Sequence, residues 1–250
     1  MMCLRINEKR IDVFLFFSLL LFFSCSPKKN ISAKSIVEKG IKFHDDSNNW
    51  KNLKTLSFNK KVILFLEDGS VESEVNQHQE FVFYPELSGK ISWKRGVDSI
   101  SIVYKNGKLK KFINKIPTLS LKELKSAENT FFASQYVIRQ PFDLLEKNIK
   151  LIYSGIKQLK ENKAHEIKVT YDEDKEKSDQ WFYYFDVNTF KVVANKIIRS
   201  DHISLVNNIT FNSKTDFIFN ENRKSYRLNE QGEKTYLRAE YFYSNYKTSY

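Results

Sequence analysis

The apolar residues of this chain recur in two rhythms, one helical and one alternating. Helical spacing runs through residues 32–43, where Gly40 interrupts it, and through residues 120–139. Gln140-Pro141 ends the second stretch, because the residue before a proline disfavours helical backbone. Each stretch holds a serine three residues ahead of a glutamate, the spacing of a capping box. These pairs are Ser35 with Glu38 and Ser120 with Glu123. The pattern predicts two helices.

Most of the remaining chain alternates between apolar and polar positions, which is typical of strands with one buried face. Asp68-Gly69 and Asn106-Gly107 are strong two-residue hairpin turns, because these residues tolerate a positive φ. The predicted strands cover residues 57–67, 72–84, 90–94, 99–105, 109–113, 150–159, 164–171, 180–186, 191–200, 204–211, 214–219, 224–228 and 236–246. The order predicts an α+β fold, an antiparallel meander whose apolar inner face the two helices cover.

The first residues read as an export signal. Basic residues precede an apolar run, Val13–Cys25, that is shorter than the roughly 20 residues of a membrane-spanning helix. The run ends at a cysteine and so resembles a bacterial lipoprotein signal. That resemblance implies a signal peptide over residues 1–24, with Cys25 carrying acyl chains such as palmitate. A lipidated tether would then span residues 25–31, ahead of a single domain over residues 32–250.

Lipidation would place the domain in the cell envelope, held on a membrane by its acyl chains. Ser26 follows the cysteine, which in Gram-negative sorting implies the outer membrane. The next residues are not acidic, which favours the periplasmic face over export to the surface. Cys3 and Cys25 are the only cysteines, so the domain holds no thiol for a disulfide or for a cysteine-based zinc site.

The chain is basic, with a formal net charge of +11. Basic surfaces attract nucleic acid or anionic lipid. Only eight of the 41 basic residues are arginine, however, and bidentate phosphate recognition favours arginine. The lysines also lie scattered among acids. We therefore expect no nucleic-acid partner, and at most an assisting role for lysines beside anionic head groups.

No sequence motif points to catalysis, and we expect neither an enzyme nor a cofactor or metal. The four histidines lie far apart, and the chain has no His-Glu-x-x-His, Gly-x-Ser-x-Gly or glycine-rich phosphate loop. The acidic run from Asp172 to Asp179 lacks the glycine of a calcium loop, so it is expected to be a solvated turn. The remaining signal is a set of aromatic residues that would either fill a core or line a cavity. These candidates for a hydrophobic ligand are Trp93, Phe131, Phe132, Tyr136, Trp181 and Tyr183.

The order of several short phrases resembles the LolA-like (outer-membrane lipoprotein carrier-like) envelope lipoproteins, in particular an uncharacterised lipid-anchored branch. The phrases lie at residues 36–44, 50, 136–145, 153–155, 163–169, 181–186 and 236–241. The chain departs from the family after His44, where Asp45-Asp46 replaces Gly-Gly. The resemblance implies a half-open β-barrel with helices plugging its concave face, and an apolar cavity for acyl chains.

Two functions remain open at this point. The first is a lipid-anchored periplasmic protein that holds a lipid or other hydrophobic ligand in a half-barrel cavity. The second is a non-enzymatic structural or interaction lipoprotein with a filled core that presents a surface to other envelope proteins. A third, an exported hydrolase, has no motif to support it.

Overall fold

The computed structural model describes residues 31–159, 162–171 and 179–250. The predicted signal peptide, Cys25 and nearly all of the tether lie outside the described residues, as does most of the acidic run. Within them, Ser32–Tyr250 forms one compact unit. No helix in the described part of the chain is long and apolar enough to cross a membrane.

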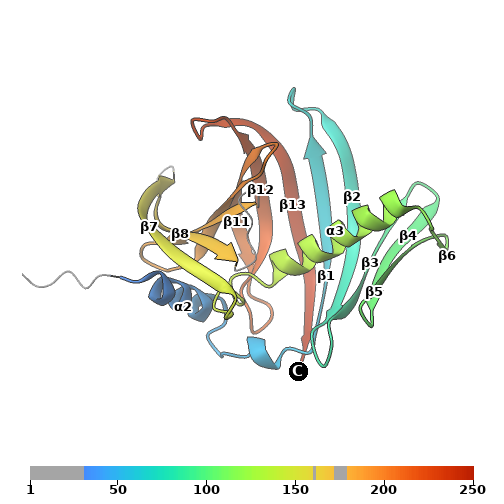
Figure 1. Cartoon of the computed structure of the whole chain (residues 1–250), viewed down its shortest axis with the longest axis horizontal. Helices are drawn as coiled ribbons and strands as arrows, with labels where there is room; N and C mark the ends of the chain where they lie inside the picture. Colours follow the sequence, from blue (N-terminus) through green and yellow to red (C-terminus); the bar gives the residue numbers. More distant parts are fainter. Residues whose placement is uncertain (1–30, 160–161, 172–178) are drawn as a thin grey trace, which may run out of the picture. The chain divides into compact units, whose positions relative to one another are not determined.

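The described fold is an antiparallel sheet of 13 strands with two α-helices (Figure 1). The first elements are α2 (Ala33–His44), the short 3₁₀ helix η1 (Trp50–Asn52), β1 (Thr55–Phe65), β2 (Val71–Val82), β3 (Ser88–Arg95), β4 (Asp98–Lys105), β5 (Lys108–Ile113) and β6 (Ile116–Pro117). They are followed by α3 (Leu121–Ile138), β7 (Ile149–Leu159), β8 (Asn162–Tyr171), β9 (Gln180–Asp186), β10 (Val192–Ile198), β11 (Ile203–Asn212), β12 (Phe219–Leu228) and β13 (Lys234–Ser249).

The strand order is β6-β5-β4-β3-β2-β1-β13-β12-β11-β10-β9-β8-β7. Each half of the chain is a meander, and β1 pairs with β13 to join them at the centre, from Thr55 opposite Ser249 to Leu64 opposite Ala239. The two edge strands, β6 and β7, do not pair with each other within the described residues, so the curved sheet is not closed. The prediction of a large curved antiparallel sheet is confirmed.

α3 lies across the strands and packs against β4 and β5 (Figure 1). Its Phe131 is fully buried and meets Phe81 of β2 and Tyr104 of β4, with ring centroids 5.5 and 5.0 Å away. The Ser120 side chain accepts a hydrogen bond from the Glu123 amide (3.4 Å), which confirms the predicted start of this helix. This packing gives the β1–β6 half of the sheet its aromatic core.

α2 packs against β7 and β9, with Ile36, Val37, Gly40 and His44 buried. Its N-cap is Ser32, whose hydroxyl accepts from the Ser35 amide at 3.1 Å. The prediction that Ser35 and Glu38 form the capping box is therefore wrong, because the helix begins one turn earlier in a serine-rich stretch.

The predicted strand over residues 214–219 is also wrong. The amide of Lys214 donates to the Asn212 side chain, and that of Phe217 donates to the Thr215 hydroxyl, so local side chains bend the chain there. Phe217 is fully buried, and the Ile218 amide donates to the carbonyl of His44 at 2.9 Å. Phe217 packs against Trp50 of η1 and against Phe142, so its apolar character reflects core packing and not a strand. β12 consequently begins at Phe219 and is longer than the 224–228 prediction, while β6 and η1 were not predicted.

Candidate functional site

The clearest candidate for a binding site is a cavity of about 580 Å³ between α3 and the tips of the central strands, which we call the strand-tip cavity. It falls within the ~300–1,000 Å³ typical of small-molecule sites. α3 contributes Phe132, Ala133, Tyr136 and Val137. The sheet contributes Leu64, Trp181, Ile197, Arg199, His202, Ser204, Val206, Ser225, Arg227, Arg238, Ala239 and Tyr241. The alternation of side chains along each strand aims these residues at one face.

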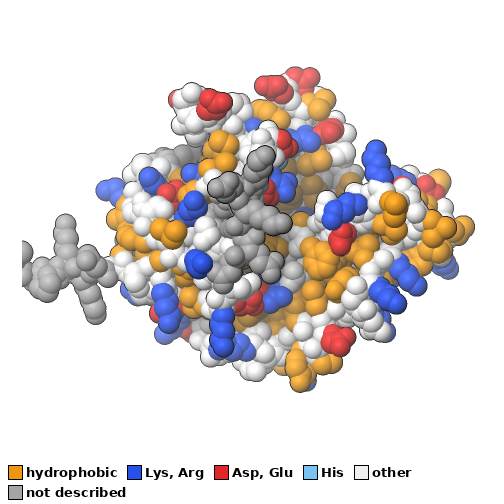
Figure 2. All heavy atoms as spheres, in the orientation of Figure 1, with side chains coloured by type: hydrophobic (Ala, Val, Ile, Leu, Met, Phe, Trp, Pro, Cys, Tyr) orange, Lys and Arg blue, Asp and Glu red, His pale blue; other side chains and the backbone are white. Residues whose placement is uncertain are grey.

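Three of the six predicted ligand residues line this cavity, namely Phe132, Tyr136 and Trp181. The rings of Tyr136 and Trp181 lie 4.9 Å apart and form one wall. Phe132 is 37% exposed, so it borders the cavity from the solvent side of α3. Hydrophobic side chains gather along α3 in Figure 2.

The other three predicted residues lie elsewhere. Phe131 is part of the packed core, and Trp93 of β3 lines a separate, lysine-rich surface pocket. Tyr183 is buried beside the strand-tip cavity and, with Tyr136 and Trp181, lines an adjoining space of about 20 Å³. The six candidates therefore do not form one site.

A buried polar cluster surrounds that small adjoining space. The hydroxyl of Tyr136 lies 2.5 Å from that of Tyr171 and 2.9 Å from that of Tyr183. Burial raises the pKa of Tyr183 and of Tyr136 well above the ordinary value for a phenol, so both stay neutral. Arg223 is 6% exposed, and within the described ranges its side chain donates to the amide oxygens of Asn195 and Asn208, at 2.6 and 2.8 Å. The buried guanidinium of Arg223 is thus stabilised by the neutral side-chain amides of Asn195 and Asn208.

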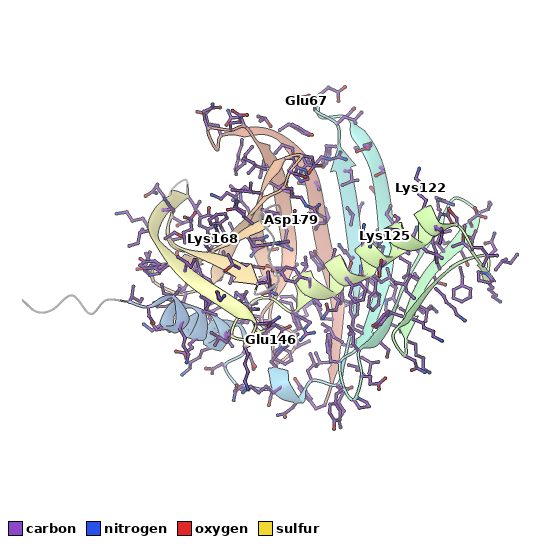
Figure 3. The ribbon with its side chains drawn as sticks, viewed as in Figure 1. Glu67, Lys122, Lys125, Glu146, Lys168 and Asp179 are labelled. Carbon is purple, nitrogen blue, oxygen red and sulfur yellow. The ribbon has the colours of Figure 1, made fainter. Side chains whose placement is uncertain are left out.

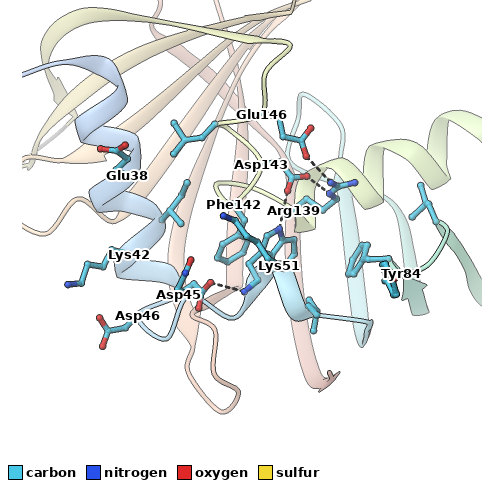
Figure 4. Close-up of a pocket in the computed structure, with 17 residues that line it drawn as sticks. Glu38, Lys42, Asp45, Asp46, Lys51, Tyr84, Arg139, Phe142, Asp143 and Glu146 are labelled. Atoms are coloured by element: carbon cyan, nitrogen blue, oxygen red, sulfur yellow. Dashed lines mark hydrogen bonds and ion pairs between the residues drawn. The ribbon is translucent and has the colours of Figure 1, made fainter.

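A second concave region, the α2–α3 groove, lies between the C-terminal ends of the two helices and measures about 830 Å³ (Figure 4). Its aromatic floor is Trp50 stacked on Phe142, with ring centroids 4.1 Å apart. The Trp50 indole donates to Asp143 at 3.0 Å, and Arg139 pairs with both Asp143 and Glu146. The charged groups at its centre are therefore already paired with one another.

Electrostatics in the α2–α3 groove favour a structural junction over a binding site. Asp45 is buried and accepts from the amides of Asn49 and Trp50, both at 2.9 Å, so it caps η1. Burial raises the pKa of Asp143, against the opposing effects of Arg139 and Trp50. The structure thus gives Asp45 a capping role.

The residues that sequence reasoning missed are the arginines around the strand-tip cavity. Arg223, Ser225 and Arg227 occupy alternate positions of β12 and therefore lie on the same face of that strand. That alternation of polar residues in a strand was visible in the sequence. Arg199 comes from the β10–β11 turn and Arg238 from β13, so only the fold brings them to the same cavity.

No three histidine, cysteine, aspartate or glutamate side chains gather as a potential metal site within the described ranges. Asp179, which is labelled in Figure 3 and directly precedes β9, pairs instead with Arg199, its Oδ2 lying 2.9 Å from the guanidinium Nε.

Comparison with solved structures identifies the fold. A LolA superfamily protein from Nitrosomonas europaea matches with a TM-score of 0.54 at 10% identity, over 87% of this chain and 93% of that one. A DUF1329 family protein from Desulfovibrio piger matches with a TM-score of 0.56 at 7% identity, over 86% and 92%. An outer membrane lipoprotein-sorting protein domain from Vibrio parahaemolyticus matches with a TM-score of 0.50 at 5% identity, over 87% and 93%.

These likenesses confirm the LolA-like fold that the sequence phrases predict. A search of curated proteins finds no match. Residues 9–224 match the family of unknown function DUF6503. The chain therefore belongs to DUF6503, a family of unknown function, and it has the fold of LolA superfamily proteins.

Proposed function

We propose that this protein is a lipid-anchored envelope protein that holds an acyl chain or another hydrophobic ligand in the strand-tip cavity. In this proposal α2 and α3 together cover the concave face of the half-open barrel, and Cys25 anchors the domain to the outer membrane on its periplasmic side. The protein acts as a binder and not as an enzyme.

The observation that carries the proposal is the unfilled space between α3 and the sheet. Its walls include Leu64, Val206 and the Tyr136–Trp181 pair, and a chain seated there would remove apolar surface from water. Such burial is worth about 25 cal/mol per Å² of apolar surface. Phe131, next to the cavity-lining Phe132 on α3, is fully buried. The unfilled space is therefore confined to the cavity and does not reflect a loosely packed core.

The fold and the N-terminal sequence add support. One of the similar structures is described as a lipoprotein-sorting domain, which suggests a role in handling lipid for this chain too. The apolar run ending at Cys25 suggests export and acylation. Both observations support the proposal that the hydrophobic cavity serves in a compartment that is rich in acyl chains.

The alternative is an interaction lipoprotein that presents an apolar surface to another envelope protein. It is favoured by one observation, the exposure of Ile116 in β6 and of Leu119 and Leu121 around the start of α3, at 70%, 88% and 82%. Such a role needs no ligand in the cavity. The two proposals can therefore be separated by blocking the cavity and leaving this surface intact.

Ala133→Trp offers that block. Ala133 is exposed and lines the cavity from α3, so a larger side chain can fill the space without entering the core. Asn129→Trp is the matched control, because it adds the same side chain at an exposed position one turn earlier, outside the cavity lining. Both are made in the full chain, so any covalent acyl groups are common to all samples.

The assay is titration with a neutral fluorescent fatty-acid ester. We expect binding by the wild type and by Asn129→Trp, and binding at least tenfold weaker by Ala133→Trp. A wild type that does not bind the ester, or equal binding by all three proteins, would remove support for the cavity as the binding site.

A further inference from the structure

Arginine is concentrated around the strand-tip cavity, although lysine is the commoner basic residue of the chain. Of the six arginines in the described ranges, three line the cavity, namely Arg199, Arg227 and Arg238. A fourth, Arg223, lies on the same face of β12 beside the adjoining small space. Among the described residues that line the strand-tip cavity there is no lysine, aspartate or glutamate.

Strand register explains how residues distant in sequence meet there. Arg227 of β12 lies opposite Ser204 of β11, and its Nη1 donates to the Ser204 hydroxyl at 2.6 Å. Arg199 closes the β10–β11 turn, where its amide donates to the carbonyl of His202. Arg238 lies in the first part of β13 (Lys234–Ser249), which is two strands away from β11 in the sheet. All three therefore stand at the same end of the sheet.

Two of the three cations are neutralised by carboxylates of the protein. Arg199 pairs with Asp179, and Arg238 pairs with Glu72 and also donates to the carbonyl of Phe65. Arg227 differs, because its side-chain partner in the described part of the chain is the neutral Ser204 hydroxyl. It is partly buried and faces an apolar cavity, where an uncompensated charge is costly.

A carboxylate or phosphate would neutralise that charge. The planar guanidinium presents two parallel N–H groups, a geometry that suits the two oxygens of such a head group better than a lysine ammonium does. With a head group at Arg227, an attached chain would extend along the cavity toward Tyr136 and Trp181, which lie on its α3 side.

We infer that the ligand of the strand-tip cavity is an anionic amphiphile whose carboxylate or phosphate head is bound by Arg227 at the strand tips. The inference rests on the proposed function and makes it narrower. It excludes neutral hydrophobic molecules as the preferred ligand. It also assigns head-group binding to arginine and not to the lysines.

The test compares matched probes that differ in head charge. Palmitate is paired with methyl palmitate, and a lysophosphatidic acid with the corresponding monoacylglycerol, each displacing a neutral fluorescent ester from the full chain. Arg227→Gln removes the cation. Arg95→Gln, an exposed arginine on the β3–β4 turn, is the control because it lowers the net charge equally.

We expect the wild type and Arg95→Gln to prefer both anionic probes over their neutral partners. In Arg227→Gln the anionic probes should bind about tenfold more weakly or worse, as expected for a lost charge-assisted hydrogen bond, while the neutral probes bind as before. Unchanged ester binding also reports that the variant is folded. If Arg227→Gln does not fold, Arg227→Lys keeps the charge without the fork and should retain a reduced preference.

Three results would overturn the inference. They are an equal affinity of the wild type for acid and ester, an unchanged preference in Arg227→Gln, and displacement of the anionic probes by inorganic phosphate alone, which would indicate a free-anion site. A wild type that binds none of the four probes would instead contradict the proposed function itself. The two failures are thus distinguishable.

Discussion

His44 couples the stability of the fold to pH through its position at the end of α2. Its side chain is 3% exposed and contacts the rings of Phe43, Phe142 and Phe211. Nδ1 lies 2.7 Å from the carbonyl of Ile218, and the amide of Val192 donates to Nε2 at 3.3 Å. These partners fix a neutral ring with its proton on Nδ1.

Protonation would place a second proton on Nε2 and break the bond from Val192. Burial lowers the pKa of His44 from 6.5 to about 4, with a further lowering by Lys191 and an opposing effect of the Ile218 carbonyl. Between pH 6.5 and pH 4, His44 is protonated in the unfolded chain but stays neutral in the folded chain. The contribution of His44 to the free energy of unfolding is therefore fully present above pH 6.5. About 3 kcal/mol of it is lost as the pH falls toward 4.

Urea denaturation of the wild type and of His44→Gln at intervals between pH 7 and pH 4 measures this contribution. Other titrating groups affect both proteins, so the difference between them isolates His44. At pH 7 the variant should be less stable by about 1–3 kcal/mol, because it disturbs two buried hydrogen bonds. By pH 4 the wild type should have lost about 3 kcal/mol relative to the variant, so the difference in stability should vanish or reverse in sign. A difference that stays constant with pH would refute the reasoning, and the exposed His78→Gln controls for the loss of a histidine as such.

Three further changes test other parts of the account. Cys25→Ala should abolish labelling by a fatty-acid probe and release the protein from membranes, whereas unchanged labelling would contradict the lipoprotein reading. In urea denaturation, Phe131→Ala should lower the free energy of unfolding by about 3–5 kcal/mol, because the side chain is fully buried. Phe132→Ala should lower it by less than half of that amount, and equal losses would mean that Phe132 does not border a cavity. Gly40→Ala should cost about 1–3 kcal/mol through overpacking, since a Cβ there would lie 2.4 Å from the Phe185 ring, and a neutral or stabilising effect in thermal melts would contradict this contact.

Local patterns were sufficient to predict most of the elements. Alternation identified twelve of the thirteen strands at least in part, and the Ser120 cap and Pro141 bounded α3 correctly. Gly40, which weakened the helix prediction, is explained by its contact with Phe185 of β9. That contact joins residues far apart in the chain, so no local rule could reveal it.

The errors have a common physical cause. The apolar residues Phe217 and Ile218 suggested a strand, yet Phe217 packs against Trp50 and Phe142 and the backbone of Ile218 bonds to His44. Phe131 and Phe132 are neighbours of the same type, but the turn of α3 buries one and exposes the other. The arginines of the cavity come from the β10–β11 turn, β12 and β13, and only the fold brings them together.

The central claim is that a hydrophobic ligand occupies the strand-tip cavity, and mass spectrometry of the full chain purified from its own envelope tests it most directly. A covalent acyl group stays attached in a denaturing spectrum, whereas a bound ligand is lost, so the difference between native and denatured masses is the ligand. We predict a lipid-sized difference for the wild type and for Asn129→Trp that disappears in Ala133→Trp. Identical native and denatured masses for the wild type would contradict the account.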